Sequence, residues 1–169
     1  MPQDISFISP PYFLNYINLV PDDDINKAYE TQQQVVDNFF DDIPSEKHTY
    51  AYAPGKWDLK TLLQHITDAE RVFNYRVLSI SRGEKQNLNG FSENDYAEAS
   101  DAASKSWDIL VKELKAVRIA TRLLVENLTI SQLEAVGQSN GNRVSVKALA
   151  FIIPGHLYHH INIIQERYL

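Results

Sequence analysis

Residues 142–169, NRVSVKALAFIIPGHLYHHINIIQERYL, form the stretch around which the fold is organised. Apolar residues recur through it at helical spacing, and three of the chain's five histidines fall within it. His156 and His160 are four residues apart, so on a helix their rings lie about 40° apart on one face, one turn from each other. His159 is offset from His160 by about 100° and faces elsewhere. Two histidines at this spacing supply half of a metal site, provided that another element supplies a third ligand.

A third ligand is expected from His65, which lies on the apolar stripe of a helix predicted from Asp58 to about Arg82. A lone histidine in such a position is more often a core residue that is hydrogen-bonded to a carbonyl or a carboxylate. Three neutral imidazoles buried without a shared ion would each need a separate partner, whereas one divalent cation would bind all three. The spacing of His65, His156 and His160 therefore predicts a mononuclear site with open positions, suited to zinc, nickel or iron.

Two better-known metal motifs are missing from these helices. A zinc-protease helix carries His-Glu-x-x-His, but Leu157 follows His156 in this chain. Di-iron bundles carry Glu-x-x-His on two helices, and the sequence has no such motif. Pro154 lies inside the predicted last helix, where proline removes one hydrogen bond and costs about 3 kcal/mol. Either the helix kinks there and so aims His156, or it begins anew at this point.

The composition limits the functional classes that fit this chain. With 169 residues, 44% of them hydrophobic and 22% charged, the chain is long enough for one globular domain and needs no second. A formal net charge of −6 argues against nucleic acid as a partner, which would need a clustered basic face. The absence of cysteine excludes disulfides, cysteine–zinc sites and a thiol nucleophile from the protein itself. No signal peptide and no apolar span of about 18 residues are found, so a cytoplasmic protein without a membrane partner is expected.

The hydrophobic periodicity predicts an all-α fold. Long amphipathic helices are expected at about residues 22–40, 58–82, 101–127 and 145–169. A short turn at 129–135, a loop at 137–142 and no strand are expected. These elements predict a four-helix bundle with long interhelical loops.

The predicted helices have recognisable starts, and an arm precedes the first of them. Asp22–Asp24, Asp58 and Ser145 suit helix N-termini, where side chains cap free amides. The proline-rich stretch before Asp22 carries several aromatic residues, so we expect it to lie on the body of the protein. The chain is therefore divided into an N-terminal arm at residues 1–21 and a single bundle domain at residues 22–169.

Three residues are candidates for the immediate surroundings of the histidines. Asp68 lies one turn from His65 and could orient that ring, although a solvated helix carboxylate is the favoured interpretation. Trp57 and Tyr158 could wall a pocket, but aromatic residues at such positions usually belong to the core.

Arg76 is a candidate for substrate binding. It lies eleven residues after His65, close to three full helical turns, and hence on nearly the same stripe. It could bind a substrate carboxylate or pair with a buried acid such as Glu70 or Glu166. The structural pair is the favoured interpretation.

These residues also carry a resemblance to a known family. The sequences Pro54-Gly55-Lys56-Trp57-Asp58, His65-Ile66-x-Asp68-Ala69-Glu70-Arg71 with Tyr75-Arg76, and Gly155-His156-x-x-His159-His160 resemble the DinB/YfiT superfamily, in particular its DinB-like (DinB_2) branch. The resemblance covers roughly residues 25–169. It implies a four-helix bundle and a divalent metal held by His65, His156 and His160. Characterised relatives include S-transferases that use bacillithiol or mycothiol and a maleylpyruvate isomerase that uses a thiol cofactor, and dimers are common.

The resemblance implies a function that the residues alone do not specify. We expect a cytoplasmic, homodimeric, metal-dependent transferase that joins a low-molecular-weight thiol to a small electrophile, with a role in detoxification or stress response. Two alternatives stay open. One is a non-catalytic bundle that binds a metal or a small ligand, and the other is a purely structural, dimerising bundle without a metal.

Overall fold

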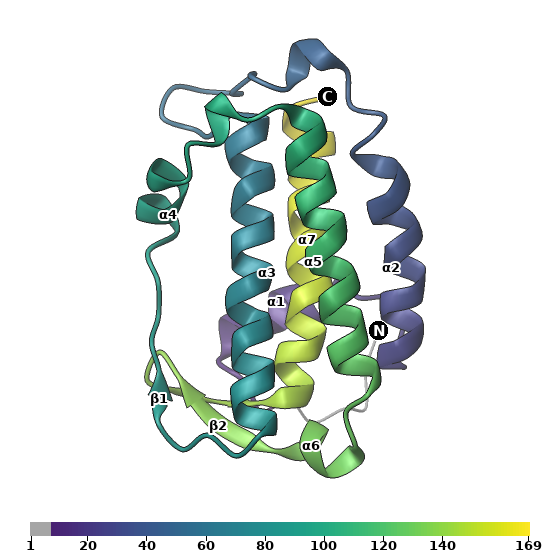
Figure 1. The fold of residues 1–169 in the computed structure, drawn as a ribbon, viewed down its shortest axis with the longest axis vertical. Coiled ribbons are helices and arrows are strands. Elements are labelled where there is room, and N and C mark those ends of the chain that lie inside the picture. The colour runs from purple at the N-terminus through teal and green to yellow at the C-terminus, as the bar shows by residue number, and fades with distance from the viewer. Residues whose placement is uncertain (1–7) are drawn as a thin grey trace.

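The computed structural model describes residues 8–169, and within them four long helices run side by side as a bundle (Figure 1). They are α2 (Ile25–Phe39), α3 (Leu59–Ser81), α5 (Trp107–Glu126) and α7 (Val146–Arg167). The predicted all-α four-helix bundle is confirmed. α3 packs against α5 and α7, and α2 packs against the same two helices. Consecutive helices α2 and α3 thus lie diagonally opposite, and the loop at residues 40–58 crosses one end of the bundle to join them.

Local capping determines where the long helices begin. Asp24, Asp58, Ser106 and Ser145 each accept a hydrogen bond from the backbone amide three residues later. Three of these caps fall where the sequence predicts them. We expected the third long helix to begin at about Asp101, but it begins at Trp107. The reason is that Asp101 has a positive φ of 49° and a short 3-10 turn follows it.

The prediction of no strand is wrong, because a small sheet closes the lower end of the bundle in Figure 1. It consists of β1 (Asn87–Leu88), β2 (Val136–Ser139) and β3 (Asn142–Ser145) in the order β1-β2-β3. β1 pairs with β2 in parallel, and β2 and β3 form an antiparallel hairpin. Asn140 and Gly141 form its turn with φ values of 50° and 75°, as a type I′ turn requires.

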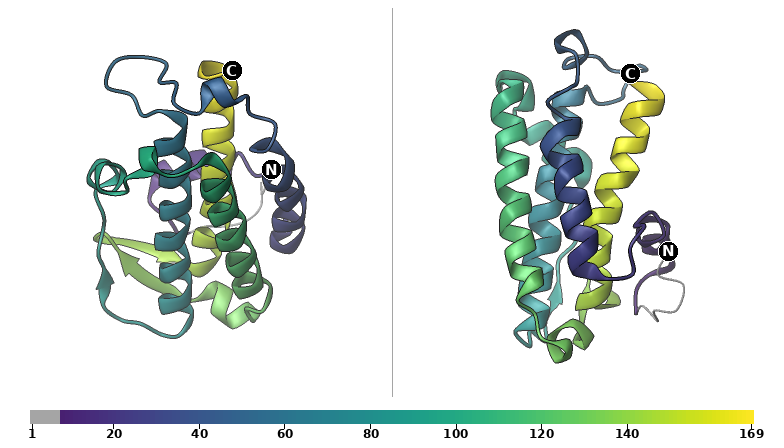
Figure 2. Two further views of the ribbon diagram at one scale, coloured as in Figure 1. Left: turned by 45° about the horizontal axis from the view of Figure 1, so that its top comes forward. Right: turned by 90° about the vertical axis from the view of Figure 1, so that its right-hand side faces the viewer.

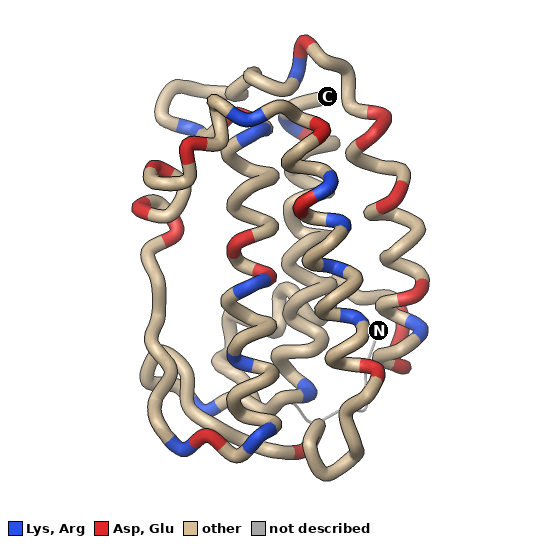
Figure 3. The backbone as a smooth tube through the Cα atoms, viewed as in Figure 1, with Lys and Arg blue, Asp and Glu red and all other residues tan. Residues whose placement is uncertain are grey.

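Shorter helices fill the connections between the long ones. α4 (Glu93–Ala99) lies beside α3, and α6 (Ile130–Glu134) lies where a turn was expected, with a capping box at Thr129. Basic and acidic residues are mixed along the long helices in the view of Figure 3. None of the helices in the described part of the chain is both long and apolar enough to cross a membrane.

The N-terminal arm lies on the bundle, as the described part of it shows. A 3-10 turn (Pro11–Phe13) leads into α1 (Leu14–Ile17), which packs on α7 (Figure 2, right). Ile17 and Val20 are fully buried there. Because the arm covers the face of α7 that would otherwise meet solvent, the first half of α7 is buried on nearly all sides.

The last helix continues without a break through Pro154, so the alternative that it begins anew there is wrong. Proline has no amide hydrogen, which leaves the carbonyl of Ala150 without its usual helical donor. The hydroxyl of Tyr29 on α2 donates to that carbonyl at 3.0 Å. Nε2 of Gln32, also on α2, donates to the carbonyl of Pro154 at 2.7 Å. These bonds offset the cost of the proline and attach α2 to α7 immediately before His156.

Candidate metal centre

Three histidines from two helices converge in the middle of the bundle. His65 lies on α3, and His156 and His160 lie one turn apart on α7. One ring nitrogen from each lies within 4.8 Å of the other two. The ring centroids are 5.3 Å (His65–His156), 5.1 Å (His65–His160) and 4.5 Å (His156–His160) apart, and each residue is at most 8% exposed. The structure therefore brings together the three side chains that the sequence spacing selected.

The donor atoms fit a small divalent cation. Nε2 of His156 and Nε2 of His160 are 3.1 Å apart. Two nitrogens bound to one tetrahedral ion at about 2.0–2.1 Å are about 3.3 Å apart, so these two atoms need little movement to share one. Nδ1 of His160 is buried and has no hydrogen-bond partner among the described residues. A set of three neutral nitrogens without a carboxylate suits zinc, nickel or iron better than magnesium or calcium.

Burial keeps these rings neutral, which is the form that binds a metal. Desolvation lowers the pKa of His65 to about 4, and the charge of His159 acts in the same direction. The pKa values of His156 and His160 also lie well below the usual value, first because of burial and then because of neighbouring histidines. At neutral pH no proton competes with a cation for these nitrogens.

Aromatic side chains surround the three rings. The ring of Trp57 lies 4.9 Å from that of His65, centroid to centroid. Tyr16, on the arm, contacts His156 edge-on at 5.5 Å and His159 at 5.2 Å. His159 is not part of the ligand group, in agreement with its predicted direction.

One cavity reaches the histidines at His156. We call it the arginine cavity; its volume is about 110 Å³, and residues lining it include Tyr16, Phe73, Arg76, Ser139 and His156. The arm, the loop after β1 and the turn of the hairpin form its walls together with α3 and α7. Segments outside the four long helices therefore shape this entrance.

A second cavity reaches the histidines at His160. We call it the tryptophan cavity; its volume is about 240 Å³, and residues lining it include Tyr52, Trp57, His160, Ile163 and Tyr168. It shares no lining residue with the arginine cavity. The candidate centre thus borders two separate spaces.

The other predicted site residues have different positions. Asp68 accepts hydrogen bonds from Gln64 at 3.0 Å and Arg71 at 3.1 Å, and it is not bonded to His65. It belongs to a hydrogen-bond network with these two residues of the same helix. Trp57 lines the tryptophan cavity and also packs against the core. Tyr158 is half-buried and lines neither of the two cavities; burial raises its pKa, and Asp22 adds to this.

The expected pair between Arg76 and Glu70 is replaced by another. Glu70 is bound at 2.7 Å by Arg118, a fully buried residue of α5. Nη1 of Arg118 donates to Gln32, also at 2.7 Å. Glu166, the other proposed partner, is exposed.

Arg118, Gln32 and Tyr29 are structural residues of the site that the sequence reasoning did not single out. Together they connect α2, α3 and α5 to the turn of α7 that precedes His156. A signal for Arg118 exists in the sequence. It follows Leu114 by four residues on the buried stripe of its helix, where a charged residue needs a buried partner.

Comparisons with known proteins agree with this arrangement. The fold is similar to that of YfiT from Bacillus subtilis, described as a probable metal-dependent hydrolase with an unusual four-helix bundle topology. The TM-score is 0.70 at 16% sequence identity, over 98% of this chain and 90% of that one, so the likeness shows a shared fold. Among curated proteins no match is found. The sequence profile of the DinB superfamily matches residues 28–164, most of the chain, and the chain therefore belongs to the DinB superfamily.

Proposed function

We propose that this protein is a metal-dependent transferase that joins a low-molecular-weight thiol to a small electrophile at His65, His156 and His160. The observation that carries the proposal is the convergence of three neutral, buried imidazoles between two separate cavities. The three histidines would hold the cation, and the helices of the bundle fix the positions of their rings.

The chemistry follows from the donor set. A divalent ion held by three neutral ligands keeps its positive charge and lowers the pKa of a thiol or water that binds it. The chain has no cysteine, so any thiol must come from solution. The two cavities match a reaction between two small molecules, because each can bring one reactant to the histidines without displacing the other.

Two other functions use the same site. Hydrolysis, which the description of YfiT suggests, would need water in place of the thiol. A non-catalytic metal- or small-ligand-binding bundle is favoured by one feature, the small volume of the arginine cavity, about 110 Å³. The experiment below separates all three.

The first measurement is elemental analysis of protein purified without a histidine tag. We expect one zinc, nickel or iron ion per chain, lost in His160→Ala and kept in the matched control His159→Ala. Metal-loaded protein is then incubated with monochlorobimane and each of bacillithiol, mycothiol, cysteine and glutathione. Metal-dependent bimane conjugation supports the transferase. Ester hydrolysis without thiol supports the hydrolase instead, and full metal loading without turnover on either substrate supports the binding protein.

The proposal includes the setting of the reaction. We propose a cytoplasmic homodimer with a role in detoxification or stress response. Exposed apolar residues of α5, among them Ile109, Ile119 and Leu123, offer a surface for self-association. Light scattering after size-exclusion chromatography tests the homodimer, and a measured mass of a single chain would contradict it.

A further inference from the structure

A buried arginine in the arginine cavity has no acidic partner among the described residues. Arg76 is 6% exposed, and among the described residues its hydrogen bonding is limited to Nη2, which donates to the carbonyl of Asn89 at 3.0 Å. Its Nε is buried without a hydrogen-bond partner. None of the ion pairs found in the described part of the chain includes Arg76. Because an arginine keeps its charge at neutral pH and buried charges are usually paired, this guanidinium lacks an anion within residues 8–169.

A second unpartnered polar group lines the same cavity. Ser139, at the end of β2, is 7% exposed, and its Oγ is buried without a hydrogen-bond partner among the described residues. Arg76 and Ser139 come from different elements, a long helix and the hairpin. Two residues that line one cavity, each with an unsatisfied hydrogen-bonding group, indicate a ligand that accepts hydrogen bonds from both.

The cavity extends from this polar end to the histidines. The ring of Phe73 lies 5.7 Å from Cζ of Arg76 and 5.8 Å from the ring of His156, so one aromatic side chain contacts both ends. A cavity of about 150 Å³ accommodates benzene, so the 110 Å³ here suits a fragment of about four or five non-hydrogen atoms. A carboxylate on a two-carbon chain has this size.

We propose that the arginine cavity binds the carboxylate of a small anionic substrate, with Arg76 and Ser139 as hydrogen-bond donors and Phe73 against the carbon chain. The inference rests on the proposed function in one respect: it makes the molecule that carries this carboxylate the electrophilic reactant that meets the thiol beside His156. Glu93 also lines the cavity. Its negative charge opposes a bound carboxylate, so removal of that charge strengthens binding.

The test of binding uses metal-free protein, so that a carboxylate cannot coordinate the ion. Propionate and its uncharged isostere propionamide are titrated against ¹⁵N-labelled, tag-free protein, and the shifts of the Arg76 Nε–H signal and of the backbone around Ser139 are followed by NMR. We expect propionate to bind at least ten times more tightly than propionamide. Equal affinities for the two would overturn the proposal.

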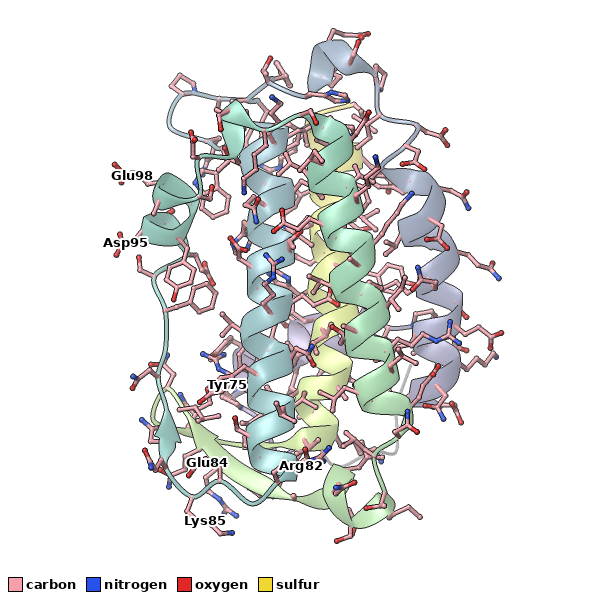
Figure 4. The ribbon with its side chains drawn as sticks, in the orientation of Figure 1. Tyr75, Arg82, Glu84, Lys85, Asp95 and Glu98 are labelled. Atoms are coloured by element: carbon pink, nitrogen blue, oxygen red, sulfur yellow. The ribbon has the colours of Figure 1, made fainter. Side chains whose placement is uncertain are left out.

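Variants test the contribution of Arg76 to propionate binding. Arg76→Gln should weaken propionate binding about ten- to a hundred-fold, since a charge-assisted hydrogen bond is lost. Arg82→Gln is the matched control: this arginine lies at the exposed end of the same helix, outside the cavity, and should change nothing (Figure 4). Unchanged binding by Arg76→Gln refutes the site. If that variant does not fold, two other variants decide. We expect Ser139→Ala to bind propionate several-fold more weakly and Glu93→Gln to bind it several-fold more tightly. Unchanged binding in both variants would refute the site.

A separate assay keeps this inference apart from the transferase proposal. Metal-loaded protein is given a thiol with chloroacetate or chloroacetamide. In both reactions the thiolate forms a C–S bond, chloride leaves, and the thiol proton passes to the buffer. A lower KM for chloroacetate that disappears in Arg76→Gln supports the carboxylate site. Thiol transfer with the same KM for both electrophiles refutes the site and leaves the transferase, whereas propionate binding without any thiol transfer refutes the transferase and leaves the site.

Discussion

The arm lies close against α7 at Gly155, and Gly155→Ala tests whether that close approach matters. A Cβ built at this position would lie 2.1 Å from the carbonyl oxygen and 2.4 Å from the carbonyl carbon of Tyr16. Ordinary carbon–oxygen contacts need about 3.4 Å or more, so one backbone must move by about 1.3 Å. Neither partner is a flexible side chain. The arm must therefore shift or leave α7.

The expected cost follows from what the arm buries. Ile17 and Val20 are 1% and 0% exposed, and full burial of such side chains contributes about 1.5–3 kcal/mol each. Alanine in place of glycine inside a helix adds about 1 kcal/mol to the free energy of unfolding. If the arm keeps part of its contacts, we expect Gly155→Ala to lower the free energy of unfolding by about 1–3 kcal/mol. Helix propensity alone predicts the opposite sign.

Urea denaturation measures the stability, and hydrogen exchange reports the arm directly. We expect faster exchange of the amides of residues 16–20 in Gly155→Ala. Ile17→Ala weakens the same contact from the other side, so the double variant should lose less than the sum of the two single losses. A Gly155→Ala protein that is more stable than the parent, with unchanged exchange in the arm, would refute the reasoning.

Three further predictions concern the buried polar groups. Arg118→Met leaves the carboxylate of Glu70 buried and unpaired, and should lower the free energy of unfolding, measured by urea denaturation, by about 3–5 kcal/mol. Arg122 is more exposed, so Arg122→Met should lower it by about 1 kcal/mol or less. Tyr29→Phe removes the donor to the carbonyl that the proline of α7 leaves free, and should cost about 1–3 kcal/mol by the same measurement. The pKa of His65 falls to about 4 in the folded chain, so between that pH and about 6.5 the unfolded state binds more protons than the folded state, and stability decreases as the pH falls. The free energy of unfolding of metal-free protein should fall through this window by up to about 1.4 kcal/mol per pH unit for this residue, and a flat profile from pH 7 to 5 would contradict it.

The sequence was most informative where structure is determined locally. Caps such as Asp58 and Ser145 act on amides three residues away, and the spacing of His156 and His160 follows from helix geometry alone. The sheet was missed because its strands are two to four residues long, too short to show alternation. The Asn140-Gly141 dipeptide was the available sign of a hairpin.

Tertiary pairing was harder to predict than local structure. His65 could be placed on a stripe, but which helix would face it depended on the diagonal order of the bundle, which periodicity does not determine. The same limit explains the partner of Glu70. Arg76 and Arg118 both lie on buried stripes, and because α5 packs against α3, Glu70 forms its ion pair with Arg118. Among the described residues, that outcome leaves Arg76 without an acidic partner.

The residues that violate helix rules lie next to the candidate centre, and the surrounding structure compensates for each. Pro154 frees a carbonyl that α2 satisfies through Tyr29. Gly155 has no side chain, and the backbone of the arm occupies that space. The next residue is His156, whose ring contacts Tyr16 of the same arm. The helix α2 and the arm contribute no ligand, but they pack on α7 at the two residues that precede this histidine. A helix with alanine at both of those positions would need neither the hydrogen bond from Tyr29 nor the close approach of the arm, so the position of the histidine ring depends on both elements.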